Sequence, residues 1–172
     1  MKKFLIIIDG PMGSGKTTIG KLLHKKLKRT ARLSTDGIKF LLSDFERGER
    51  DNAITTSVLM QMYKEYVRQG INILLPQGFW KKEYIEPYIK FAKKNKLKTF
   101  IYQLEAPREV LLKRIENRPK PALAKTSVPK SRILLNLRTW EKHKYQMGKN
   151  FDTTKLSPEQ VVKEILKDLK VK

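Results

Sequence analysis

Residues 10–18 carry the clearest chemical pattern of the chain, which has the form G-x-x-x-x-G-K-[ST]. An apolar run, Phe4–Ile8, precedes the pattern, and apolar residues with helical spacing follow from Ile19. Glycines let a loop turn its backbone N–H groups towards anionic oxygens, and the next helix adds the positive end of its dipole. The stretch therefore predicts a phosphate-binding loop (P-loop), formed by Gly10, Pro11, Met12, Gly13, Ser14, Gly15, Lys16, Thr17 and Thr18.

Three further side chains have the right chemistry to act beside this loop. Lys16 itself can reach the β- and γ-phosphates of a nucleotide, and the Thr17 hydroxyl is the expected ligand of Mg²⁺. Phosphoryl transfer to a hydroxyl also needs a carboxylate that takes the proton, for which Asp36 is the candidate. An Asx turn or a helix cap would also suit this aspartate. Lys39, one helical turn later, either binds an anionic group of the acceptor or is solvated.

Two arginines lie four residues apart at the end of a predicted helix, 106–117. Charge collects on the equatorial oxygens of a phosphoryl group in transfer, so cations are needed on the side opposite the P-loop. Arg118 is the first candidate and Arg114 the second, against the alternative that each is an ordinary surface arginine. We expect a lid at about residues 114–132.

Two other classes of P-loop protein lack their characteristic residues here. A GTPase needs an Asn-Lys-x-Asp segment, and Asn95-Lys96-Leu97-Lys98 has no aspartate. A motor or transporter ATPase normally carries an acidic residue after a hydrophobic strand, and the strand expected at 71–75 is followed by Pro76-Gln77. A kinase remains, with Gln77 as a candidate substrate-binding residue.

The elements that must position these residues alternate between strand and helix. Strands are expected at 4–8, 31–35, 71–75, 99–104 and 150–152, and helices at 16–29, 38–42, 52–69, 81–95, 106–117, 130–147 and after the capping residue Ser157. This order predicts one α/β domain over residues 1–172, with a parallel sheet of about five strands. The 52–69 helix is expected to bury Ile54, Val58, Leu59, Met62 and Tyr66.

Composition limits the class of protein further. The 172 residues include no cysteine, which excludes disulfides and thiolate metal sites. The N-terminal apolar run is too short to cross a bilayer and leads into Asp9-Gly10, which argues against a signal peptide. We therefore expect a soluble, cytoplasmic protein without a membrane partner.

The net charge of +21 is the unusual feature of the composition. It favours binding to polyanions, although a solvated coat of lysines would give the same total. Between Asn117 and Asn150 a single acid, Glu141, accompanies nine basic residues: Arg118, Lys120, Lys125, Lys130, Arg132, Arg138, Lys142, Lys144 and Lys149. This density suits a nucleic-acid backbone. Phe79-Trp80 and Trp140 either stack on bases or pack in the core.

Together these motifs resemble the polynucleotide kinase, chloramphenicol phosphotransferase and zeta-toxin branch of P-loop kinases. The resemblance is carried by the P-loop, Ser34-Thr35-Asp36, Leu104–Val110, the arginine pair and Phe151–Thr154. It implies a three-layer α/β/α P-loop kinase fold, ATP with Mg²⁺, Asp36 as catalytic base, and lid arginines on the phosphates. The chain departs from this group at Lys39, where arginine is usual, and at Gln77, which replaces an acid.

The acceptor is open between three alternatives. The lid segment 113–129 is most similar to polynucleotide 5′-hydroxyl kinases, which agrees with the basic charge and favours an RNA or DNA 5′ end. Ile8-Asp9-Gly10-Pro11 is similar to nucleoside-monophosphate kinases, so a nucleoside, nucleotide, antibiotic or amino sugar is the alternative. The third is an ATP-gated nucleic-acid-binding protein without transferase activity.

Overall fold

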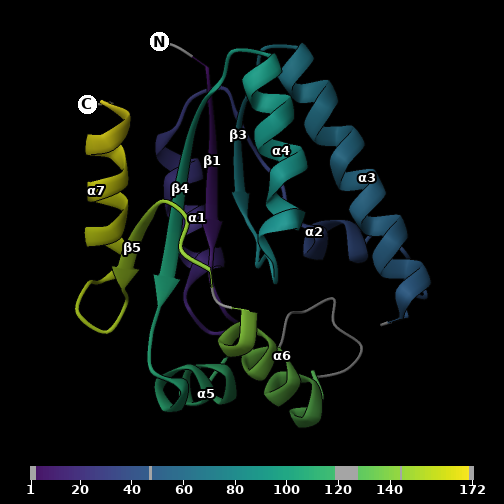
Figure 1. The fold of residues 1–172 in the computed structure, drawn as a ribbon, viewed down its shortest axis with the longest axis vertical. Helices are drawn as coiled ribbons and strands as arrows, with labels where there is room; N and C mark the ends of the chain where they lie inside the picture. The colour runs from purple at the N-terminus through teal and green to yellow at the C-terminus, as the bar shows by residue number, and fades with distance from the viewer. Residues whose placement is uncertain (1–2, 47, 119–127, 144, 171–172) are drawn as a thin grey trace.

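A five-stranded, all-parallel sheet in the order β2-β3-β1-β4-β5 forms the centre of the molecule (Figure 1). The computed structural model describes residues 3–46, 48–118, 128–143 and 145–170. The strands are β1 (Phe4–Asp9), β2 (Thr30–Arg32), β3 (Asn72–Pro76), β4 (Lys98–Glu105) and β5 (Lys149–Asp152). The helices are α1 (Lys16–Lys26), α2 (Thr35–Lys39), α3 (Glu49–Arg68), α4 (Lys82–Lys94), α5 (Arg108–Glu116), α6 (Lys130–His143) and α7 (Pro158–Leu169).

Helices cover both faces of the sheet because its central strand is apolar on both faces. Along β1, Leu5 and Ile7 pack towards α3 and α4, whereas Ile6 and Ile8 pack towards α1 and α7. Side chains alternate between the faces of a strand, so an uninterrupted apolar run gives two cores. This arrangement confirms the predicted three-layer α/β/α fold with a parallel five-stranded sheet.

The carboxyl ends of all five strands point to the same edge of the sheet, and α5 and α6 lie beyond that edge (Figure 1). The P-loop, α2 and the segment after β3 begin there as well. Parallel sheets bind ligands at this edge, so the fold gathers the predicted site residues on one side of the molecule.

The buried face of α3 differs from the prediction. Thr55, Leu59, Tyr63 and Val67 face the sheet, and of the five residues predicted to be buried only Leu59 is fully so. Ile54, Val58 and Tyr66 are exposed, and Met62 is half-buried. Polar side chains can face inwards here because their hydroxyls are bonded: Tyr63 donates to the Tyr88 carbonyl at 2.7 Å and Thr55 donates to the Asn52 carbonyl at 3.0 Å.

Several predicted boundaries also need correction. The first helix ends at Lys26 rather than near residue 29, α2 occupies 35–39 rather than 38–42, and α6 ends at His143 rather than 147. The start of α2 shifts because a long-range contact, from Thr35 N to the Gln77 side chain, holds it. The capping box of α7, between Ser157 and Gln160, is confirmed. Most of the predicted lid loop, residues 119–127, lies outside the described residues.

Candidate active site

The P-loop connects β1 to α1, and its shape depends on glycines. Gly10, Gly13 and Gly15 have positive φ angles of 147°, 85° and 96°. A Cβ on Gly13 would lie 2.8 Å from the Leu111 carbonyl oxygen, because the backbone of α5 packs directly on the loop. Glycine is therefore required both for the positive φ angles of the turn and for the close contact with α5.

Lys16 extends across the mouth of this loop. Its Nζ donates hydrogen bonds to the carbonyl oxygens of Gly10, at 2.8 Å, and Pro11, at 2.7 Å. Burial lowers the pKa of Lys16 to about 8. The negative charges of Asp9 and Asp36 oppose this change, and the positive charge of Arg118 adds to it. Groups from three separate segments thus act electrostatically on one ammonium. Phosphate oxygens can replace the two carbonyls as its acceptors.

Asp36 lies at the start of α2 with a side chain that is 73% exposed. Lys39, which is 20% exposed, donates to Asp36 Oδ1 at 3.2 Å from one turn further along the helix. Gln77, after β3, accepts a hydrogen bond from Thr35 N through Oε1 at 3.0 Å. The predicted substrate-binding residues therefore form one group, in which Gln77 anchors the helix that carries Asp36.

The two candidate arginines have different environments. Arg118 follows α5, and its positive charge acts on Lys16. Arg114 donates from Nη1 to Thr153 Oγ1 at 2.8 Å and from Nη2 to the Thr153 carbonyl at 2.7 Å. Arg114 thereby ties α5 to the segment after β5, whereas Arg118 is the member of the pair whose charge acts on the P-loop lysine.

Asp9 is the residue of this site that the sequence analysis passed over. Its carboxylate is fully buried and accepts from Gly10 N at 2.7 Å, Phe79 N at 2.8 Å and the Tyr145 hydroxyl at 2.7 Å. Burial raises the pKa of Asp9, although the bonds from Phe79, Tyr145 and Gly10 oppose the change. An acid that ends a buried strand ahead of a P-loop was the only available signal, since Tyr145 is 136 residues away.

A cleft of about 350 Å³ lies beside the P-loop, next to the ends of β4 and β5. Its lining is partly apolar, from Pro11, Ala106, Pro107, Leu111, Leu137 and Trp140, and partly charged, from Glu105, Arg108, Glu141 and Asp152. Phe79 and Trp140 are buried, so of the two alternatives given for them, core packing is the one that the structure supports. Trp80 is half-buried.

The loop has the donors that a nucleoside triphosphate requires. Its backbone amides lie at the N-terminus of α1, and the buried Ser14 hydroxyl has no hydrogen-bond partner among the described residues. Thr17 is exposed at the first turn of the same helix. Within the described ranges no three His, Cys, Asp or Glu side chains cluster as a metal site. Mg²⁺ nevertheless fits, because it takes few protein ligands when phosphates and water supply the rest.

A P-loop at the carboxyl edge of a parallel sheet with helices on both faces defines a P-loop protein of the three-layer α/β/α class. The family model described as an AAA domain matches residues 5–143, and the chain belongs to this family. No helix among the described residues has both the length and the apolar character that a membrane span needs.

Comparison with individual proteins gives the same picture. The chain is 29% identical over 120 residues to a probable adenylyl-sulfate kinase of Archaeoglobus fulgidus, an alignment that covers 64% of this chain and 72% of the relative. A candidate kinase from Chloroflexus aurantiacus superposes with a TM-score of 0.73 at 19% identity, over 99% of this chain and 98% of the other. One chain of the Pnkp1/Rnl/Hen1 RNA repair complex superposes with a TM-score of 0.69 at 16% identity, over 86% of this chain and 47% of that chain. The structural likenesses show a kinase fold.

Proposed function

We propose that the chain is an ATP-dependent kinase that transfers the γ-phosphoryl group to a hydroxyl, with a polynucleotide 5′-hydroxyl as the favoured acceptor. One observation supports this most: Lys16 Nζ lies in the P-loop on the carbonyl oxygens of Gly10 and Pro11, and the charges of Asp36 and Arg118 act on it from two other segments. A carboxylate base, a phosphate-binding cation and a second cation are the three groups that phosphoryl transfer to a hydroxyl requires.

Each residue has one role in the proposed reaction. The P-loop amides and Lys16 hold the phosphates, and Asp36 accepts the proton of the acceptor hydroxyl as its oxygen bonds to the γ-phosphorus. The bond from the γ-phosphorus to the bridging oxygen breaks, and ADP leaves. Arg118 balances the charge that collects on the transferring group. The Thr17 hydroxyl would hold Mg²⁺, which supplies further neutralisation of the phosphates.

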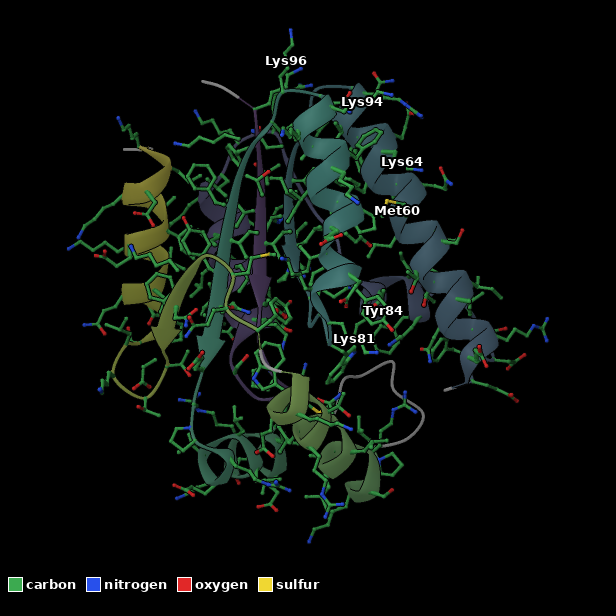
Figure 2. All side chains as sticks on the ribbon, viewed as in Figure 1. Met60, Lys64, Lys81, Tyr84, Lys94 and Lys96 are labelled. Carbon is green, nitrogen blue, oxygen red and sulfur yellow. The ribbon has the colours of Figure 1, made fainter. Side chains whose placement is uncertain are left out.

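A basic and aromatic surface beside the site favours the polynucleotide acceptor. Lys81, Lys82 and Tyr84 are exposed at the first turn of α4, directly after the segment that follows β3. Figure 2 shows Lys81 and Tyr84 at the end of α4 that is nearer the carboxyl edge of the sheet, with Lys94 and Lys96 at the other end. Lysines next to an exposed aromatic ring suit a single strand, in which phosphates alternate with bases.

A small-molecule acceptor is the second candidate, favoured by the 29% identity to a probable adenylyl-sulfate kinase and by the half-buried Lys39, a cation suited to a small anion. Incubation of the protein with γ-labelled ATP and a panel of acceptors separates the two. The panel comprises 5′-hydroxyl oligonucleotides, nucleosides, adenylyl sulfate and aminoglycosides. Label in oligonucleotides supports the first candidate, and label only in a small molecule overturns it in favour of the second.

Two variants separate a kinase from an ATP-gated binding protein. Asp36→Asn keeps the shape of the side chain but removes the base, so transfer should fall while ATP still binds. Lys16→Ala should lower both the rate of transfer and the affinity for ATP. Unchanged turnover in Asp36→Asn would show that the base has been assigned wrongly. ATP binding by the wild type without transfer to any acceptor would favour the non-catalytic reading.

A further inference from the structure

Tyr145 lies in the segment between α6 and β5, and the structure fixes both its backbone and its hydroxyl. Gln103 of β4 donates to the Tyr145 carbonyl at 3.0 Å and accepts from Met147 N at 2.9 Å. With the backbone held on both sides, the Tyr145 hydroxyl reaches Asp9 Oδ2 at 2.7 Å. The bond is thus part of a partly buried network around Asp9, and this network does not include the proposed base, Asp36.

Asp9 connects Tyr145 to the P-loop through its second carboxylate oxygen. Its other oxygen, Oδ1, accepts both from Gly10 N, where the loop begins, and from Phe79 N, in the segment after β3. The second bond keeps Gly78 against the loop, where an added Cβ would lie 3.3 Å from the Gly10 carbonyl oxygen. This is the same carbonyl oxygen that Lys16 binds.

We propose that Tyr145 is a positioning residue for nucleotide binding, which acts through Asp9 to hold the P-loop and the segment after β3 in the shape that receives a triphosphate. The inference rests on the proposed function only in taking ATP as the ligand. Without the hydroxyl, the Gln103 amide, at 3.5 Å, is the donor that Asp9 Oδ2 keeps among the described residues. A buried carboxylate that loses a short hydrogen bond takes up a proton or turns to a cation that already acts on it, here Lys16, and both changes disturb the loop.

Tyr145→Phe tests this with the smallest possible change. We expect the Kd for MgATP, measured by isothermal titration calorimetry, to rise about tenfold, as for loss of one hydrogen bond to a charged group. Turnover at saturating ATP should change less than about threefold, since neither Asp36 nor Arg118 is affected. Hydrogen exchange of the amides in 10–18 and 77–80 should be faster in the nucleotide-free protein.

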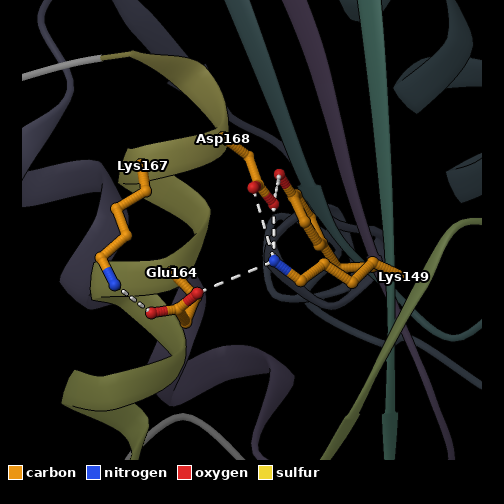
Figure 3. A network of polar contacts seen from close by, with 5 residues as sticks. Lys149, Glu164, Lys167 and Asp168 are labelled. Atoms are coloured by element: carbon orange, nitrogen blue, oxygen red, sulfur yellow. Dashed lines mark hydrogen bonds and ion pairs between the residues drawn. The ribbon is translucent and has the colours of Figure 1, made fainter.

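Tyr102→Phe is the matched control. The Tyr102 hydroxyl also donates to a carboxylate, Asp168 Oδ2 at 3.2 Å, but this lies on α7 beside Lys149 and away from the P-loop. Figure 3 shows Lys149 between Asp168 and Glu164 in this second network. Like Tyr145→Phe, the control variant should lose the stabilisation that one hydroxyl–carboxylate hydrogen bond gives to the folded protein. The Kd for MgATP and the hydrogen exchange of the P-loop amides should not change.

The outcomes are distinct. Unchanged Kd and exchange in Tyr145→Phe, or equal changes in Tyr102→Phe, would overturn the positioning role. In an Asp9→Asn background, Tyr145→Phe should alter exchange of the amides in 10–18 less than about twofold, because the acceptor of its bond is no longer a carboxylate. Exchange in 77–80 is not used for this comparison, since the Tyr145 hydroxyl also contacts the Phe79 carbonyl oxygen at 3.3 Å. Failure of the wild type to bind MgATP would overturn the proposed function, whereas the exchange comparison would still decide whether Tyr145 holds the loop.

Discussion

The two flanks of the P-loop are built in opposite ways. On the open flank, next to β2 and β3, Asp36 accepts from Lys39 and Gln77 accepts from Thr35 N, and the Asp36 side chain is 73% exposed. The flank next to β4 and β5 also borders the cleft, but we call it closed because its polar side chains are bonded to one another. Asp9, Gln103, Tyr145 and the Arg114–Thr153 pair form buried or half-buried bonds there, between 2.7 and 3.5 Å.

The difference follows from what each flank has to do. A group that accepts a proton from a substrate must be reachable, so it cannot be satisfied by the protein. A loop that wraps phosphates must keep its shape before they arrive, since preorganised donors cost no rearrangement during the reaction. Changes on the open flank should therefore alter chemistry with little effect on stability, and changes at the loop or the closed flank should alter binding or stability.

The largest effect is expected at the loop itself. Lys16→Ala removes the cation that would contact the β- and γ-phosphates, and transfer should fall by ~10³-fold. Steady-state rates with γ-labelled ATP measure this. A loss below tenfold would mean that the phosphates lie elsewhere.

On the open flank, Asp36→Asn should lower kcat by ~10²-fold, because the base is lost. The Kd for MgATP and the melting temperature should stay close to wild type, since the side chain is exposed and its hydrogen-bond partner is Lys39, one turn along the same helix. A drop in melting temperature of several degrees would instead identify Asp36 as a structural cap and would contradict the difference between the two flanks.

The buried ammonium should carry a cost in stability. The pKa of Lys16 is about 8 in the folded chain against 10.5 for the free group. Below pH 8 both states are protonated and the cost is complete. Between 8 and 10.5 the unfolded chain binds the extra proton, so the wild type gains stability as the pH rises. Denaturant unfolding of Lys16→Met should show up to ~3 kcal/mol more stability than wild type at pH 7 and a smaller difference at pH 10.

Gln77→Met should lower kcat about tenfold, the cost of one lost hydrogen bond to a group that places a reactive side chain. The Thr35 N–H loses its acceptor, so α2 and Asp36 become less well positioned. Gln69→Met, which removes an exposed side-chain contact with Glu65 on α3, is the control and should leave kcat unchanged. Equal kcat values for the two variants would show that Gln77 does not position Asp36.

The smallest effect concerns the basic surface. The double variant Lys81→Ala/Lys82→Ala should raise KM for a 5′-hydroxyl oligonucleotide about fivefold at low salt and flatten its salt dependence. Lys93→Ala/Lys94→Ala makes the same change of charge at the other end of α4 and should have less effect. Equal effects from the two pairs would show that the lysines act as a general coat.

Much of the architecture was predictable because it depends on local periodicity. Uninterrupted apolar runs such as Phe4–Ile8 identify strands buried on both faces, and the spacing in residues 10–18 identifies the P-loop. The α3 face was assigned wrongly because apolar spacing favoured Ile54 and Tyr66, whereas packing chose Thr55 and Tyr63, whose hydroxyls find partners in the fold. The early start of α2 likewise depends on Gln77, 42 residues away from Thr35.

The layered fold could be predicted from the sequence, together with the P-loop and the set of candidate cations and carboxylates, since each follows from residues that are neighbours in the chain. Which of these residues act together depends on the three-dimensional fold. In the fold, the charges of Asp36 and Arg118 act on Lys16, and Arg114 donates a hydrogen bond to Thr153. Asp9 accepts a hydrogen bond from Tyr145, which is 136 residues away. A hydrogen bond or charge interaction between distant segments leaves no periodic pattern in the sequence, because it exists only once the sheet has set the distance between those segments.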